Sequence, residues 1–169
     1  MQIKKIFEFT GKIIFISIMV FSAQSCTKNL VFDDYQSIKN SKWHKDSIIK
    51  FNVNSIDTLS KNNIYVNIRN NKNYEFSNLF LIVGINFPNN YQIIDTLEYE
   101  MTDTNGRFLG NGISDILENK LEYKTNVSFP VKGNYQIQVQ HAMRKNQNVD
   151  GLIYLNGIED VGVVIEKND

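Results

Sequence analysis

The sequence predicts an all-β domain, an antiparallel β-sandwich with an immunoglobulin-like or jelly-roll-like arrangement. Apolar and polar residues alternate with a period of two in several stretches, as they do in strands that bury one face. Turn signals such as Asn89-Asn90 and Asn105-Gly106 separate these stretches, and short strands divided by turns at intervals of roughly 8 to 12 residues are typical of sandwiches. The 169-residue chain, 42% hydrophobic, is long enough for one domain with a substantial core.

Several stretches carry the strand pattern. In the segment 64–69, Ile64, Val66 and Ile68 alternate with polar or amphipathic residues. The segment 79–87 is apolar on both faces, which predicts a strand in the middle of a sheet. The expected strands are 47–53, 64–69, 79–87, 93–101, 122–129, 136–141 and 161–166.

One stretch predicts a helix. Ser114 is placed to cap a turn in which Ile116, Leu117 and Leu121 recur at a spacing of three to four residues. We therefore expect a short helix over 114–121.

The first 25 residues have the features of a secretory signal peptide. Lys4, Lys5 and Lys12 are basic, the run 13–21 is apolar, and small residues lead into Cys26. A helix of this nine-residue run would cover only about 14 Å of a hydrocarbon core about 30 Å thick, so a permanent membrane span is not expected. We expect three regions: a signal peptide at 1–25, a lipidated tether at 26–42, and the sandwich at 43–169.

Cys26 is the single cysteine of the sequence and follows Ala23-Gln24-Ser25, which resembles a bacterial lipobox. We expect its thiol to be lipidated. One acyl chain holds a protein on a membrane only marginally, whereas the two or three chains of a bacterial lipoprotein hold it stably. The polar stretch 27–42 has few periodic apolar positions, which is typical of a tether.

Charge and motif content exclude several classes of function. Removal of residues 1–25 leaves 15 basic and 17 acidic residues, so the footprint of a nucleic-acid-binding protein is absent. A lone cysteine supplies neither a disulfide nor a thiolate metal site. The two histidines, His44 and His141, are far apart in the sequence and outside any metal-binding motif, and we interpret them as a partly exposed polar residue and a core residue. We expect no cofactor and no metal.

Two weaker alternatives remain open. Glu98 and Glu100 lie on one face of an expected strand, as either a carboxylate pair of the kind that hydrolases use or a solvated surface. Surface tyrosines could form a platform for a glycan, or they could fill the edges of the core. The tyrosines in question are Tyr91, Tyr99, Tyr123, Tyr135 and Tyr154.

Ordered motifs along the chain resemble the gliding motility lipoprotein GldH family of the Bacteroidota. They are WHKD at 43–46, NIYVNIRNNKNYEFSNLFLIVGINFP at 63–88, DTLEYEM at 95–101, NGRFLGNG at 105–112, ENKLEYK at 118–124, GNYQIQVQHAMR at 133–144 and GIEDVGVVIEK at 157–167. The resemblance spans nearly all of the expected domain and carries no catalytic residues with it. Phe108 departs from the pattern, since we expect a tryptophan there; the bulky apolar character is kept and the indole N–H donor is lost.

The resemblance implies a noncatalytic envelope protein that supports gliding and type IX secretion, docking other gliding or secretion lipoproteins. Within the loop 105–112, Phe108 and Leu109 are the expected contact residues, together with the sheet edges; the alternative is an ordinary hairpin with Phe108 folded inward. No acidic residue directly follows Cys26, which favours the periplasmic face of the outer membrane. The competing function is a module that binds a glycan or peptidoglycan.

Three tripeptides resemble the Asp-Ser/Thr-apolar acceptor of O-glycosylation in envelope proteins of the Bacteroidota. Their hydroxyl residues are Ser47, Thr58 and Thr96. A glycan can be added only where the hydroxyl is accessible, so exposure in the fold decides which of the three qualifies.

Overall fold

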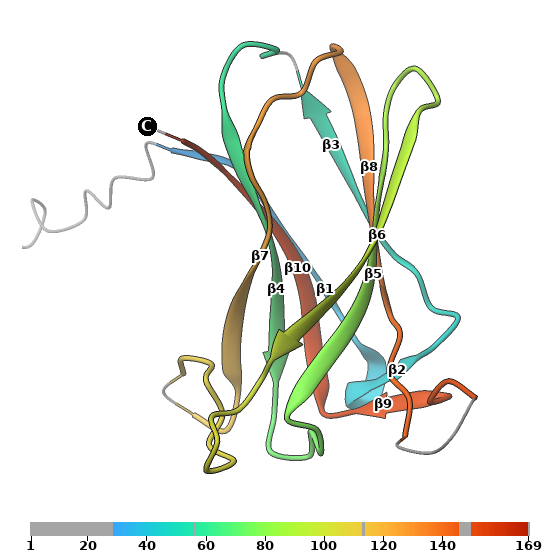
Figure 1. The fold of residues 1–169 in the computed structure, drawn as a ribbon, viewed down its shortest axis with the longest axis vertical. Helices are drawn as coiled ribbons and strands as arrows, with labels where there is room; N and C mark the ends of the chain where they lie inside the picture. Colours follow the sequence, from blue (N-terminus) through green and yellow to red (C-terminus); the bar gives the residue numbers. More distant parts are fainter. Residues whose placement is uncertain (1–28, 56, 113, 146–149, 169) are drawn as a thin grey trace, which may run out of the picture.

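The computed structural model describes residues 29–55, 57–112, 114–145 and 150–168 (Figure 1). Over these residues the chain forms two four-stranded antiparallel sheets that face each other, with a small two-stranded sheet at one end. The predicted antiparallel β-sandwich is confirmed. Among the same residues, no helix has the length and apolar character needed to cross a membrane.

The first sheet has the strand order β1-β10-β4-β7 and the second has the order β3-β8-β5-β6. The small sheet pairs β2 with β9. The strands are β1 Leu30–Ser37, β2 Lys42–His44, β3 Ile49–Ser55, β4 Asn62–Asn70, β5 Asn78–Asn86, β6 Gln92–Glu100, β7 Leu117–Val127, β8 Gly133–His141, β9 Tyr154–Asn156 and β10 Ile158–Lys167, and a 3-10 turn, η1, covers Lys39–Ser41.

The core lies between the two sheets because the strands alternate as the sequence predicts. In β3, buried Ile49, Phe51 and Val53 alternate with exposed residues, and β8 repeats the pattern. β5 lies between β8 and β6, which confirms that the apolar segment 79–87 forms an interior strand. The side chain of Trp43 from β2 closes the core at one end, where it is fully buried and its Nε1 donates to the Ser47 carbonyl at 2.9 Å.

The two ends of the sandwich are distinguished by the chain termini. The terminal end consists of the start of β1, the end of β10 and the loops 57–61, 87–91 and 128–132. The far end consists of η1, β2, β9 and the loops 71–77 and 101–112. Figure 1 shows the terminal end at the top and the far end at the bottom.

The expected tether at 26–42 is wrong from Leu30 onward. Residues 30–37 form β1, an edge strand that pairs antiparallel with β10. Most of its side chains are exposed, so it lacks the apolar alternation that marks other strands, and its backbone hydrogen bonds hold it in the sheet. The signal peptide at 1–25 and Cys26 lie outside the described residues.

The expected helix over 114–121 is also wrong. Residues 117–127 form β7, which pairs with β4 along most of its length. Asn119, Leu121 and Tyr123 are buried at a period of two, and this strand register overrides the short helical spacing. Ser114 does accept a hydrogen bond from the Ile116 amide, at 3.3 Å, but the chain enters a strand rather than a helix.

Candidate docking surface

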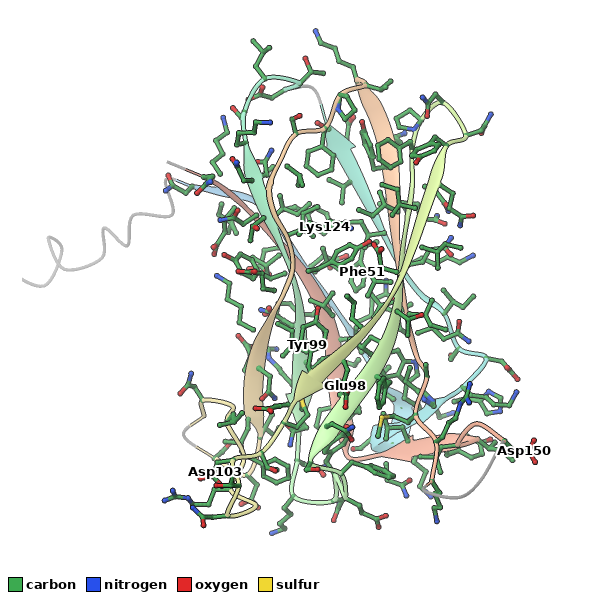
Figure 2. All side chains as sticks on the ribbon, in the orientation of Figure 1. Phe51, Glu98, Tyr99, Asp103, Lys124 and Asp150 are labelled. Atoms are coloured by element: carbon green, nitrogen blue, oxygen red, sulfur yellow. The ribbon has the colours of Figure 1, made fainter. Side chains whose placement is uncertain are left out.

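A groove at the far end lies between the last residues of β6 and the loop 101–112. Its volume is about 760 Å³. Carboxylates dominate its charge, with Glu98 and Glu100 from β6 and Asp103 from the loop, while Leu109 supplies an exposed apolar side chain. Figure 2 places Glu98 and Asp103 toward the same lower end of the molecule. The groove is lined by Ser77, Asn78, Glu98, Glu100, Thr102, Asp103, Thr104, Gly106 and Leu109.

The loop 101–112 is held in shape by a tight turn. The Asp103 amide donates to the Arg107 carbonyl at 2.8 Å, and Gly106 adopts a left-handed conformation with φ of 78°. The Asp103 carboxylate accepts hydrogen bonds from the Arg107 amide and guanidinium, both at 2.9 Å, and from the Asn105 amide at 2.8 Å. These bonds hold the pKa of Asp103 below its usual value. Asp103 escaped the sequence analysis, although Asp-Thr-Asn-Gly is a recognisable turn sequence.

The two apolar residues of this loop have different roles. Phe108 is half-buried against the core, and its ring centre lies 6.5 Å from that of Tyr74. Leu109 is 52% exposed and lines the groove. The alternative in which Phe108 folds inward is therefore the one observed, and Leu109 is the side chain of the pair that a partner can reach.

The sheet edges, expected as contact surfaces, are partly closed by hydrogen bonds from the facing sheet. The side-chain Nε2 of Gln36 in β1 donates to the Lys50 carbonyl of β3 at 2.6 Å. On the other side, the Tyr99 hydroxyl donates to the Glu122 carbonyl of β7 at 2.7 Å. Burial, followed by the charge of Glu122, raises the pKa of Tyr99 to about 12, so this hydroxyl keeps its proton. Strand addition at these edges would have to break such bonds.

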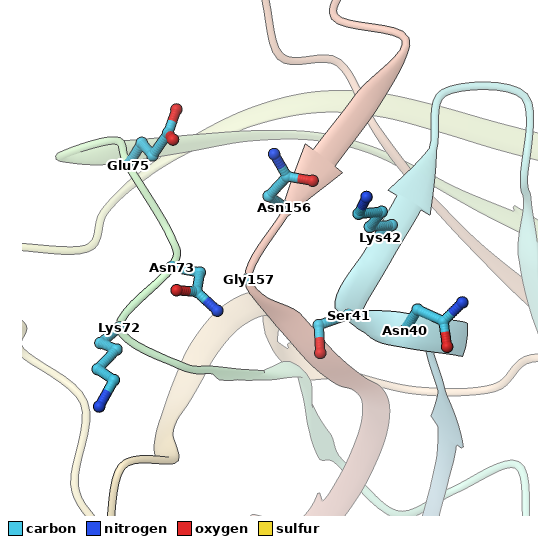
Figure 3. Close-up of a pocket in the computed structure, with 8 residues that line it drawn as sticks. All are labelled: Asn40, Ser41, Lys42, Lys72, Asn73, Glu75, Asn156 and Gly157. Atoms are coloured by element: carbon cyan, nitrogen blue, oxygen red, sulfur yellow. The ribbon is translucent and has the colours of Figure 1, made fainter.

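A second hollow at the far end is polar throughout. It has a volume of about 440 Å³ and is lined by residues of η1, β2, β9 and the loop 71–77 (Figure 3). The Gly157 amide donates to the Ser41 carbonyl at 2.8 Å, and the Ser41 hydroxyl donates to Glu159 at 2.8 Å. Asn40, Ser41 and Gly157 all have positive φ, so the backbone here is fixed by local hydrogen bonds.

Of the two histidines, His141 is among the residues that line a third hollow at the far end, and His44 is not. His141 is 3% exposed, its Nε2 donates to the Trp43 carbonyl at 3.1 Å, and burial lowers its pKa to about 4. It is a core histidine, as predicted. His44 is half-buried, with its ring against Tyr154 at 4.9 Å between ring centres. Among the described residues, no group of three or more His, Cys, Asp and Glu side chains is arranged to bind a metal.

The five candidate tyrosines do not form one surface. Tyr123 and Tyr135 are buried, and the Tyr99 hydroxyl is bonded to the facing sheet. Tyr91 and Tyr154 are 59% and 52% exposed, but Tyr91 lies at the terminal end and Tyr154 at the far end. A stacking platform for a glycan needs aromatic rings side by side, and these residues do not provide it.

The three candidate glycosylation sites differ in exposure. Ser47 is exposed in the turn between β2 and β3, and Thr96 is exposed on the edge strand β6. Thr58 is half-buried in the loop 57–61. Ser47 and Thr96 are therefore the more accessible acceptors.

Comparison with known proteins gives long matches over the same region. Residues 30–165 match the family described as GldH lipoprotein. The chain is 49% identical over 161 residues to the gliding motility lipoprotein GldH homolog of Christiangramia forsetii, covering 95% of this chain and 97% of the relative. It is 44% identical over 160 residues to the gliding motility lipoprotein GldH of Flavobacterium johnsoniae, with the same coverage of both chains. Among solved structures, the VP2 subviral particle of infectious bursal disease virus gives a TM-score of 0.36 at 11% identity, covering 80% of this chain and 32% of that chain, a likeness too weak to support any conclusion.

Proposed function

The chain belongs to the GldH lipoprotein family, and we propose that it is a noncatalytic envelope protein that supports gliding and type IX secretion by docking another lipoprotein. The proposal includes an acyl anchor on Cys26 and a position on the periplasmic face of the outer membrane. The family supplies the lipoprotein character and the motility context, while the docking role rests on the groove at the far end.

The groove carries the docking proposal because it combines charge with an exposed apolar residue. Glu98 and Glu100 give it a negative lining, while Asp103 is paired with Arg107, and Leu109 lines the same groove and is 52% exposed. Interfaces of this type gain most of their binding energy from a few apolar anchors, while surrounding charges select the partner. The expected partner surface is a small apolar pocket flanked by lysine or arginine.

A pull-down from gently solubilised envelopes tests this function. The tagged, lipidated protein is compared with Cys26→Ala, which has no acylation site, and with Leu109→Asp. Ile153→Asp is the matched control, because Ile153 is 55% exposed at the same end but lines a different hollow. We expect Leu109→Asp to weaken recovery of gliding or secretion components about tenfold or more, as loss of an interface anchor does, and Ile153→Asp to recover them normally.

Two results would contradict the proposal in different ways. Full partner recovery and normal gliding with Leu109→Asp would exclude the groove as the docking surface. Recovery of the wild-type protein alone, from cells that glide, would exclude the docking role itself. It would favour the competing function, binding of a glycan or peptidoglycan.

The proposed O-glycosylation sites are Ser47 and Thr96. Both hydroxyls are exposed, and neither residue lines the groove. Peptide mass spectrometry of the protein from its own envelope would detect the added sugar.

A further inference from the structure

The terminal end of the sandwich lies a short chain length from the proposed anchor. β1 pairs with β10 from Leu30 onward, so four residue steps separate Cys26 from the sheet. An extended chain spans at most about 3.6 Å per residue, which limits this separation to about 14 Å. A tether over 26–42 would have allowed about 58 Å. A lipid on Cys26 would therefore hold the terminal end close to the bilayer.

The loop 57–61 is tied to this same end. Lys167, the last residue of β10, places its Nζ 3.2 Å from Asp57 Oδ2. The Asp57 carboxylate also accepts hydrogen bonds from the Ser60 hydroxyl at 2.6 Å and from the Leu59 amide at 3.0 Å. These bonds, the Ser60 hydroxyl first, hold the pKa of Asp57 well below its usual value. The loop is thus an ordered turn beside the chain termini.

This turn holds an apolar side chain outward. Leu59 is 88% exposed, more than any other large hydrophobic residue described, the next being Ile94 at 61%. Tyr91 stands 59% exposed at the β5–β6 hairpin of the same end, whose turn is closed by a bond from the Phe87 amide to the Tyr91 carbonyl at 2.8 Å. An exposed aliphatic side chain and an exposed tyrosine at the same end suit the boundary between lipid headgroups and acyl chains, where aromatic residues are enriched.

The terminal end and the groove differ in charge. At the terminal end, Lys61 and Lys132 are exposed, while Asp57 is paired with Lys167. At the far end, the groove carries the carboxylates of Glu98, Glu100 and Asp103. Anionic headgroups repel acidic side chains, so charge disfavours the groove itself as a membrane contact. The far end also carries exposed basic residues, Lys39, Lys42, Lys72 and Arg107, so charge does not by itself distinguish the two ends.

We propose that the terminal end rests on the bilayer that holds the anchor, with Leu59 and Tyr91 among the lipid headgroups and the acidic groove directed away. This inference rests on the proposed lipidation of Cys26 and adds an orientation to it. In this orientation the groove faces into the aqueous compartment, where a partner can reach it.

Site-specific fluorescence in vesicles tests the orientation. Because acylation consumes the thiol of Cys26, the lipidated full chain carrying Leu59→Cys or Leu109→Cys can be labelled at one position with an environment-sensitive dye. Leu109, exposed at the far end, is the matched control. The proteins are reconstituted into phosphatidylcholine and phosphatidylglycerol vesicles with brominated acyl chains. Residues at the interface sit about 5 to 10 Å deep, so we expect the dye at position 59 to be quenched about twofold or more and the dye at position 109 to keep its emission.

The possible results distinguish a failure of the proposed orientation from a failure of the proposed lipid anchor. Co-flotation of wild-type protein with vesicles, lost in Cys26→Ala, reports anchoring alone. If the lipidated protein floats but both dyes respond equally, the orientation is overturned while the anchor stands. If the wild-type protein neither carries a lipid nor floats, the orientation and the proposed anchor fail together. A sugar found on Thr58 in the native protein would also overturn the orientation, since it would hold Leu59 away from the lipid.

Discussion

The terminal end and the far end of the sandwich are built from the same strands but differ in their connections. At the terminal end, short loops join consecutive strands: 87–91 closes the β5–β6 hairpin, and 57–61 and 128–132 cross from one sheet to the other. At the far end, the chain inserts the β2–β9 sheet, the left-handed residues around Gly157 and the folded loop 101–112. The sheets alone define the fold, and the longer connections of the far end create the hollows. The groove and the polar hollow therefore lie at the far end.

The largest expected loss of stability comes from a substitution at Gly157, in the backbone of the far end. Gly157 has φ of 84°, and a Cβ there would lie 2.3 Å from the Tyr74 amide nitrogen. We expect Gly157→Ala to lower the free energy of unfolding by about 3 to 5 kcal/mol, because both conformation and space forbid a side chain. Urea denaturation measures this loss.

Gly106 gives the matched comparison for that substitution. It has a similar φ of 78°, but a Cβ there would meet nothing within 4 Å. We expect Gly106→Ala to cost about 1 kcal/mol, from conformation alone. Equal losses at the two positions would show that packing around Gly157 does not fix the far end.

Acid is expected to lower the free energy of unfolding by protonating His141, which lies at the far end. His141 has a folded pKa of about 4 against an ordinary value of 6.5, because burial disfavours its charged form. The unfolded chain therefore binds more protons between these values, and stability is lost as the pH falls from 6.5 toward 4. The shift corresponds to a loss of about 2 to 3 kcal/mol at the acid end of this range.

The measurement is urea unfolding at neutral pH and near pH 4.5 for wild type and His141→Gln. Glutamine can still donate to the Trp43 carbonyl but does not titrate. An equal pH dependence in both proteins would place the acid sensitivity elsewhere.

A smaller effect is expected in β1, the strand that leads from the terminal end to the far end. Tyr35 stacks under Arg69, whose Cζ lies 4.1 Å from the ring centre, and its hydroxyl accepts from Asn67 Nδ2 at 2.6 Å. Asn67 is 3% exposed, so Tyr35→Ala would leave a buried amide without this acceptor. We expect a cost of about 1 to 3 kcal/mol.

Tyr35→Phe separates the two contributions, because it keeps the stacked ring and removes the hydroxyl; about 1 kcal/mol should be lost. Hydrogen exchange of residues 30–37 gives the second measurement. Protection that is absent in wild type, or unchanged in Tyr35→Ala, would contradict the role of Tyr35 in holding β1 in the sheet.

The smallest expected effect concerns the groove carboxylates as chemical groups. Glu98 accepts a hydrogen bond from Asn78 Nδ2 at 2.7 Å, and Glu98→Gln keeps an oxygen for that bond. We expect nearly normal gliding and secretion from this variant in a noncatalytic protein, because Glu100 keeps negative charge in the groove and Leu109, the proposed anchor, is unchanged. Loss of both activities at normal protein levels and with normal partner recovery would instead indicate a catalytic carboxylate at the far end.

The sequence by itself determined the strands with strong apolar alternation, such as β3, β5 and β8, and hence the sandwich class. Alternation reports burial of one face, and burial against a second sheet is what the core requires. The sequence also carries the family motifs and the residue pattern from which a lipoprotein signal peptide is expected, since these depend on local residue order.

Only the tertiary structure decided that 30–37 and 117–121 form strands and how the loop 101–112 is folded. β1 is held by backbone pairing, which polar side chains do not reveal, and β7 follows the register of β4 rather than its short helical spacing. Phe108 turns inward because Tyr74, distant in sequence, lies beside it. The groove, the partly closed sheet edges and the separate positions of the tyrosines likewise depend on contacts between distant segments. The local pattern of residues could not predict them.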